Sequence, residues 1–183
     1  MPRNRQEVPR EQRIEALLAV AEEQFLARGF AATSVAEIAR AAGIEPGSVY
    51  WYFRSKDDAF AAVLNRLLDA ETARIGALQG LAATKLFTAL DSVEQRRTLH
   101  PCVAERAPHS PAVLAYHERL HAWLRGLADD AVVDLVPGHD REMAAEAVVA
   151  AIEGALANPA PVRPASGLVR YLLSALAGTP VTT

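Results

Sequence analysis

The chain has 183 residues, of which 51% are hydrophobic, and its formal net charge is −3. The only cysteine, Cys102, excludes an intramolecular disulfide and suits a reducing compartment. No apolar stretch reaches the roughly eighteen residues that a membrane span needs, so we expect a soluble, cytoplasmic protein. Helix-forming residues are abundant and alternating β-branched runs are missing, which predicts an all-α fold.

The first predicted helix covers residues 10–28, since apolar residues recur along one helical face and Gly29 supplies a stop. A second helix opens at Ser34, which is followed three residues later by Glu37, the spacing of a capping box. Gly43 comes only nine residues after Ser34. The second predicted helix is therefore short.

A third helix is expected to begin at Pro46, because proline fits the first turn of a helix, and to end just before Ser55, the expected N-cap of a fourth. It contains four consecutive aromatic residues, at positions 50–53. Val49 and Phe53 are four residues apart and share the predicted inner face. The remaining rings lie beside that face or point outward, because a helix has one buried side.

Two short helices joined by a tight glycine-containing turn and braced by a longer helix are typical of a helix-turn-helix unit. In such units the second short helix enters the DNA major groove with its N-terminal residues at the base edges. Residues 1–56 carry eight Lys and Arg against seven acids, and residues 57–183 carry eleven against fifteen. The basic N-terminal arm, with Arg3 and Arg5, either meets an anionic partner or is a solvated tail.

This N-terminal region resembles that of TetR-family transcriptional regulators. The family has the pattern G-[FY]-x-x-T-[ST]-x-x-x-I-A before the turn and G-x-[LIV]-Y-x-[YH]-F-x-[SN]-K-[DE] after it. The matching residues are Gly29, Phe30, Thr33, Ser34, Ile38 and Ala39, followed by Gly47, Val49, Tyr50, Tyr52, Phe53, Ser55, Lys56 and Asp57. The resemblance implies a helix-turn-helix DNA-binding domain at residues 1–56 and a helical domain for ligand binding and dimerisation at residues 57–183.

By the same resemblance, the protein is expected to be a ligand-responsive, sequence-specific regulator of transcription. Most such proteins are homodimeric repressors that a small-molecule effector releases from a palindromic operator. No cofactor, metal or catalytic residue is expected. Two other functions compete with this one: a zinc-dependent hydrolase, considered below, and a helical adaptor that does not bind DNA. The helix-turn-helix residues argue against both.

The resemblance also implies which residues meet DNA. Contacts to the sugar–phosphate backbone are expected from Thr33, the backbone at Ser34, Tyr50, Tyr52 and Lys56. The residues expected nearest the base edges are Pro46, Gly47, Ser48 and Trp51. Hydroxyl groups and lysine are good phosphate partners, and such contacts fix register without reading sequence. Because the predicted recognition helix has no Arg, Asn or Gln, DNA shape and the N-terminal arm are expected to contribute to specificity.

Beyond residue 80 the pattern predicts helices at 83–97, 101–107, 111–130, 140–157 and 166–177. The helix at 140–157 has small residues near one side, and the last helix has an apolar stripe. Both features are compatible with an internal core. In TetR-like proteins the last two helices pair with their copies in a second subunit, and we favour this interpretation.

The remaining helices are expected to enclose an effector pocket. The candidate lining residues have an apolar body and a polar tip or supply wall: Phe87, His100, Cys102, Tyr116, His117, His121 and Trp123. Each of them also fits an ordinary core or surface position.

His117, Glu118 and His121 form a literal H-E-x-x-H pattern. On a helix both histidines share one face, as a zinc site requires, and the glutamate could act as a base. Glu142 and Glu146 lie downstream, so a third ligand is available. Against a hydrolase, the pattern is short and the chain lacks a plausible catalytic sheet. A regulatory or incidental metal site is the milder alternative.

Overall fold

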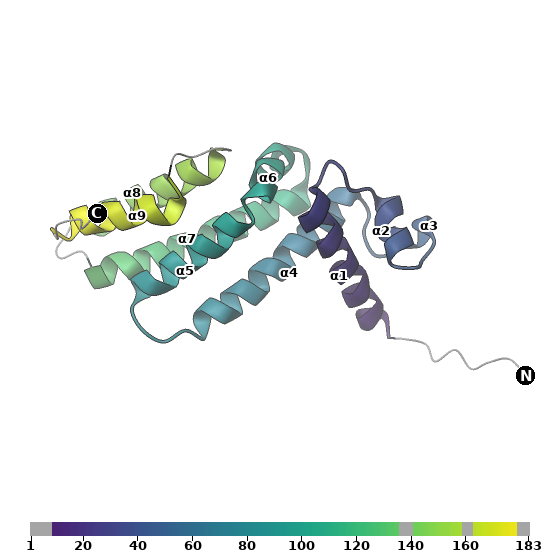
Figure 1. Ribbon diagram of the computed structural model, residues 1–183, viewed down its shortest axis with the longest axis horizontal. Helices are drawn as coiled ribbons and strands as arrows, with labels where there is room; N and C mark the ends of the chain where they lie inside the picture. Colours follow the sequence, from purple (N-terminus) through teal and green to yellow (C-terminus); the bar gives the residue numbers. More distant parts are fainter. Residues whose placement is uncertain (1–8, 136–140, 159–162, 179–183) are drawn as a thin grey trace, which may run out of the picture. The chain divides into compact units, whose positions relative to one another are not determined.

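The computed structural model describes residues 9–135, 141–158 and 163–178, and all regular structure in this part of the chain is helical (Figure 1). The all-α prediction is confirmed. The chain separates into two compact units, Met1–Asn65 and Arg66–Thr183. Their boundary falls inside helix α4 (Lys56–Gly76), whereas we predicted a division after residue 56, where this helix begins.

The first unit contains α1 (Arg10–Arg28), α2 (Val35–Ala41), α3 (Pro46–Val49) and the start of α4. The predicted capping box is present: the Ser34 hydroxyl accepts a hydrogen bond from the Glu37 backbone N–H at 3.2 Å, and the Glu37 carboxylate accepts one from the Ser34 N–H at 2.8 Å. At the start of α4, the Ser55 hydroxyl accepts from the Asp58 N–H at 3.0 Å. Both predicted N-caps are confirmed.

Helix α3 is shorter than predicted. It ends at Val49, and the aromatic residues follow it in a turn whose backbone keeps winding in the helical sense. The backbone N–H of Trp51 donates to the Ser48 carbonyl at 3.2 Å, three residues back, and the N–H of Phe53 donates to the Val49 carbonyl at 2.9 Å. Val49 and Phe53 are both buried, as predicted, so their burial holds the turn where the regular helix has ended.

The core of the first unit contains a cluster of three phenylalanine rings. Phe60 of α4 lies edge-on to Phe25 of α1, with ring centroids 5.1 Å apart, and its centroid is 4.9 Å from that of Phe30 in the turn after α1. Phe25 and Phe60 have no solvent exposure. The cluster therefore ties α1, the following turn and α4 together, and these segments support the two short helices.

The second unit contains the rest of α4, α5 (Ala82–Gln95), α6 (His100–Arg106), α7 (Pro111–Leu135), α8 (Arg141–Ala157) and α9 (Ala165–Leu176). Short 3₁₀ turns lie at Arg97–Leu99 and Ala107–His109. Helix α7 packs against α5 on one side and α8 on another, and α9 packs against α8 and α5 (Figure 1). The helices predicted beyond residue 80 are all present, and α7 continues five residues past its predicted end.

Within the described part of the chain, no helix is both long enough and apolar enough to span a bilayer.

Candidate DNA-binding site

The aromatic run after α3 divides into buried and exposed rings. The Trp51 side chain is 83% exposed and that of Tyr50 is 55% exposed, whereas Phe53 is buried. Tyr52 is half-buried, so it points outward less than the helical spacing predicted, because the chain has left the regular helix by this point. Trp51 and Tyr50 are large aromatic side chains that are exposed to solvent. Neighbouring exposed side chains of this kind are unusual in a folded domain and indicate an interaction surface.

The small residues at the start of α3 share this exposed surface. Pro46 and Gly47 are exposed, and Ser48 is half-buried. A β-carbon added at Gly47 would meet no atom within 4 Å, so the surface there is open. These residues stay predicted neighbours of the base edges.

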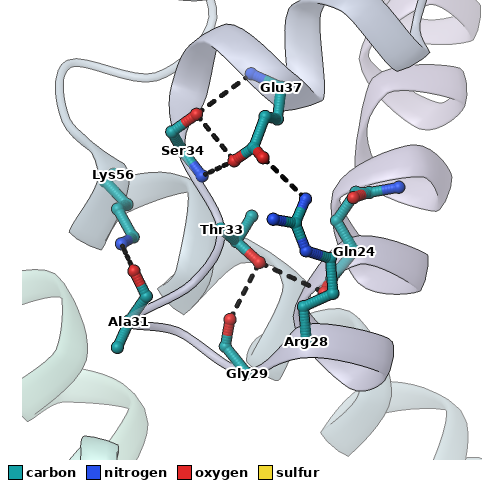
Figure 2. A network of polar contacts seen from close by, with 8 residues as sticks. All are labelled: Gln24, Arg28, Gly29, Ala31, Thr33, Ser34, Glu37 and Lys56. Carbon is teal, nitrogen blue, oxygen red and sulfur yellow. Dashed lines mark hydrogen bonds and ion pairs between the residues drawn. The ribbon is translucent and has the colours of Figure 1, made fainter.

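Thr33 lies differently from the prediction (Figure 2). Its side chain is buried, and its hydroxyl is shared between the backbone carbonyls of Gly29, at 2.8 Å, and Gln24, at 3.1 Å. Its backbone N–H donates to the Phe30 carbonyl at 3.3 Å. In this conformation the Thr33 donors are used inside the unit, where they fix the turn between α1 and α2, and its phosphate contact stays a prediction.

Ser34 is exposed, but its polar groups are also engaged (Figure 2). Its N–H and hydroxyl both donate to Glu37 Oε2, each at 2.8 Å. The other Glu37 oxygen accepts from Arg28 Nη1 at 2.7 Å. Glu37 thus joins the end of α1 to the start of α2, and a phosphate at the Ser34 N–H would compete with its carboxylate. The contact at Ser34 stays a prediction.

Lys56 is half-buried, and its ammonium group is turned toward the same segment (Figure 2). It donates to the Ala31 carbonyl at 3.4 Å and lies 4.1 Å from the centroid of the Phe30 ring. A cation over an aromatic face is attracted by the ring quadrupole. The structure gives Lys56 a bracing role, and its predicted phosphate contact stays a prediction.

The Glu37 network makes the first unit sensitive to acid. Hydrogen bonds from Ser34 and Arg28 lower the pKa of Glu37 from 4.5 to about 2. Because the folded-state pKa is depressed, the network stabilises fully above pH 4.5, and this contribution is lost as the pH falls toward 2. Glu37→Gln is expected to remove this part of the pH dependence, measured by urea unfolding followed through Trp51 fluorescence in a Trp123→Phe background.

Glu45→Gln is the matched control, because Glu45 is the N-cap of α3 and its side chain makes no capping hydrogen bond. Equal pH dependence in wild type and Glu37→Gln would contradict the assignment.

The predicted effector-pocket residues do not gather at one place. His100, His117 and His121 line a cavity of about 160 Å³ together with Val103, Ala104, Leu120, Glu153, Leu156 and Ala157. Phe87 instead lies under the Arg170 guanidinium, 4.1 Å from ring centroid to Cζ. Cys102, Tyr116 and Trp123 are not among the lining residues. Burial raises the pKa of Tyr116 to about 12, which fits a core position.

A larger open groove of about 500 Å³ lies between α4 and α5, and the sequence did not indicate it. Its buried carboxylate, Glu71, accepts two hydrogen bonds from Arg74, at 2.5 and 3.1 Å. Arg74 also donates to the Ser92 hydroxyl at 2.8 Å. Glu71, Arg74 and Ser92 therefore satisfy one another within the groove.

The H-E-x-x-H pattern brings its two histidines together as predicted, with ring centroids 4.1 Å apart. Of the later glutamates, Glu146 pairs with Arg125 at 3.6 Å. Another carboxylate, Glu153, reaches His121 instead. Among the described residues, no group of three or more His, Cys, Asp or Glu side chains is arranged to hold a metal ion.

Taken together, α2 and α3 meet across a turn at Gly43, whose φ of 67° favours glycine, and the buried parts of α1 and α4 support them. This is a helix-turn-helix unit of the kind found in DNA-binding proteins. Residues 17–63 match the family model described as bacterial regulatory proteins, tetR family. The resemblance of the first unit to the TetR family, predicted from the sequence, is therefore confirmed.

Curated relatives match over the same region. The transcriptional regulator AcrR of Shigella flexneri is 43% identical over 47 residues, which are 26% of this chain and 22% of the relative. The regulator TtgR of Pseudomonas putida is 39% identical over 51 residues, which are 28% of this chain and 24% of the relative. The matched segment thus spans less than a quarter of these relatives' lengths.

The whole fold is shared with solved regulators. A transcriptional regulator from Rhodococcus sp. Rha1 has a TM-score of 0.70 at 23% identity, covering 93% of this chain and 99% of the other. A TetR regulator from Haloarcula marismortui has a TM-score of 0.70 at 17% identity, covering 91% and 98%. A TetR-like regulator from Rhodococcus sp. RHA1 is 26% identical with a TM-score of 0.57, covering 94% and 100%. The predicted two-part helical architecture is confirmed.

Proposed function

We propose that this protein is a ligand-responsive, sequence-specific DNA-binding regulator of transcription. It acts as a cytoplasmic homodimer that represses from a palindromic operator and is released when a small molecule binds the second unit. Ligand and DNA then weaken each other's binding by the same factor, because a coupling between two sites is reciprocal. The family matches point to a regulator rather than an enzyme.

The observation that carries the proposal is the exposed surface of the helix-turn-helix unit. Trp51 and Tyr50 stand out from it, 83% and 55% exposed, while Val49 and Phe53 beside them are buried. A surface with small residues at its N-terminal end and aromatic rings beyond it fits the approach to a major groove, where apolar groups contact thymine methyls and hydroxyls contact phosphate.

The last helix supports the dimer. Val169 and Leu173 of α9 are buried within the unit, whereas Leu168, Tyr171 and Leu176 are 39%, 62% and 38% exposed. Helix α9 therefore leaves large apolar side chains in solvent beside its buried face, and an exposed apolar patch of this kind marks an interaction surface. A second copy of α9 and of the adjoining α8 would cover it, and a two-fold pair would set two recognition surfaces on successive half-sites of DNA.

Selection of bound duplexes from a randomised DNA pool tests the proposal directly. The selection is done at physiological salt so that phosphate attraction alone does not carry the signal. We expect an enriched inverted repeat. If well-folded protein enriches no sequence, with or without candidate effectors, the regulator proposal is wrong.

On the operator so defined, Trp51→Ala is expected to weaken binding by about 1–2 kcal/mol, roughly five- to thirtyfold, because one contact near the base edges is lost. The thermal stability is expected to stay unchanged, since the ring is 83% exposed. Binding is measured by gel shift or fluorescence anisotropy. Leu114→Ala removes a large exposed side chain from α7 and is the control. Equal affinities of the two variants would remove Trp51 from the interface.

A further inference from the structure

The cavity of about 160 Å³ lies among α6, α7 and α8, inside the second unit. His100 enters it from α6, and His117 and His121 enter it from α7, where they are one turn apart. The apolar part of its wall is Val103, Leu120 and Leu156. Three imidazole rings in so small an apolar-walled space are more than packing needs.

Two of the rings have their protons fixed by oxygen acceptors. His100 Nε2 lies 3.4 Å from the Val93 carbonyl, so this nitrogen carries the proton and Nδ1 keeps its lone pair. His121 Nδ1 lies 2.9 Å from Glu153 Oε1, so this nitrogen donates its proton to the carboxylate. Among the described residues, the His117 ring makes no hydrogen bond, and it lies against the His121 ring, tilted by 39°.

The charges around the cavity favour a neutral ligand. Burial, with the neighbouring histidines, lowers the pKa of His100, and burial and His121 lower that of His117, so these rings are acceptors at neutral pH. The other charged groups that act on them are Arg97 before α6, Glu118 of α7 and Glu153 of α8. A carboxylate ligand would meet Glu153, and the rings do not form a metal-binding group.

The size of the cavity limits the ligand to about one ring. An engineered protein cavity of roughly 150 Å³ binds benzene. We propose that this cavity binds a small, neutral hydroxylated aromatic compound of the phenol class, whose ring lies against Val103, Leu120 and Leu156 and whose hydroxyl donates to His117. Only the role of this compound class as the effector rests on the proposed function. Its binding to the cavity can be measured without DNA.

The test uses the purified full chain and ¹⁹F NMR titration with 4-fluorophenol and, as its partner without a donor, 4-fluorotoluene. We expect 4-fluorophenol to bind once per chain and roughly three- to tenfold more tightly, the range of one net hydrogen bond. His117→Phe keeps a ring but removes the acceptor, so it is expected to abolish this difference. Its matched control is His109→Phe, because His109 is exposed and outside the cavity.

Acid is expected to weaken the phenol and leave the toluene unchanged between about pH 7.5 and about pH 5, since protonated imidazole no longer accepts a hydrogen bond. Equal affinities of the two probes, no binding by folded protein, tighter binding of 4-fluorobenzoate, or displacement of the phenol by stoichiometric Zn²⁺ would each overturn the proposal. If an operator is enriched but phenol does not bind, the proposed phenol site is wrong and the regulator proposal stands. If phenol binds but no operator is enriched, the phenol site stands and its role in regulation is wrong.

Discussion

Phe60→Ala is expected to destabilise the first unit by about 3–5 kcal/mol, the usual cost of removing a buried aromatic ring from a packed core. Phe60 has no solvent exposure and contacts the rings of Phe25 and Phe30, so its removal leaves a cavity between α1, α4 and the turn that carries Thr33. Since the total stability of a domain is about 5–15 kcal/mol, this change would remove a large part of the stability of the first unit.

The two tryptophans allow this loss to be assigned to one unit. Trp51 lies in the first unit and Trp123 in the second, and the chain has no others. Urea unfolding of the Trp123→Phe protein therefore follows the first unit, and that of the Trp51→Phe protein follows the second. Phe60→Ala should lower the unfolding free energy of the first unit by the expected amount of about 3–5 kcal/mol. The control, Phe87→Ala, changes a half-buried ring in the second unit and should act there. A shift below about 1 kcal/mol for Phe60→Ala would show that the cluster is not what supports the short helices.

Tyr171→Asp is expected to separate the proposed dimer and to lower operator affinity by about two to four orders of magnitude, the gain that joining two binding modules provides. In a two-fold interface each copy would contribute the new carboxylate, so like charges would meet in an apolar setting. Because Tyr171 is 62% exposed in the single chain, the fold itself should tolerate the change. Sedimentation velocity measures the assembly, and gel shift measures the affinity.

Leu114→Asp places the same charge on α7 at a side chain that is 41% exposed, and it is the control. It should leave both the assembly and operator binding intact. A Tyr171→Asp protein that remains dimeric would place the interface elsewhere.

Local signals predicted the helix-turn-helix unit well. The capping box at Ser34 and Glu37, the cap at Ser55 and the glycine at position 43 act within a few residues of each other, so the sequence contains most of what determines them. The predicted end of α3 was wrong. The regular helix stops at Val49, but turn hydrogen bonds keep the backbone winding as far as Phe53. The side-chain pattern of the sequence is the same in both cases, so it could not distinguish them.

Contacts between different helices and turns were harder to predict. The hydroxyl of Thr33 turns inward because the carbonyls of Gln24 and Gly29 lie nearby, and that depends on how α1 ends. His117 and His121 meet because of helical spacing, but their neighbours His100 and Glu153 come from α6 and α8. The packing of those helices against α7 depends on tertiary contacts that one sequence does not reveal. Tyr116 and Trp123, which were grouped with these histidines, do not line the same cavity.

If the segment after Gly43 forms the proposed DNA-binding surface, its division into buried and exposed residues affects how new DNA targets can be acquired. Burial of Val49 and Phe53 anchors the segment, whereas the side chains of Pro46, Tyr50 and Trp51 are exposed. Exposed positions tolerate substitution at little cost in stability. The exposed residues can therefore be substituted one at a time, in natural evolution or by design, while each successive variant stays folded. New binding preferences are then reached without first stabilising the protein.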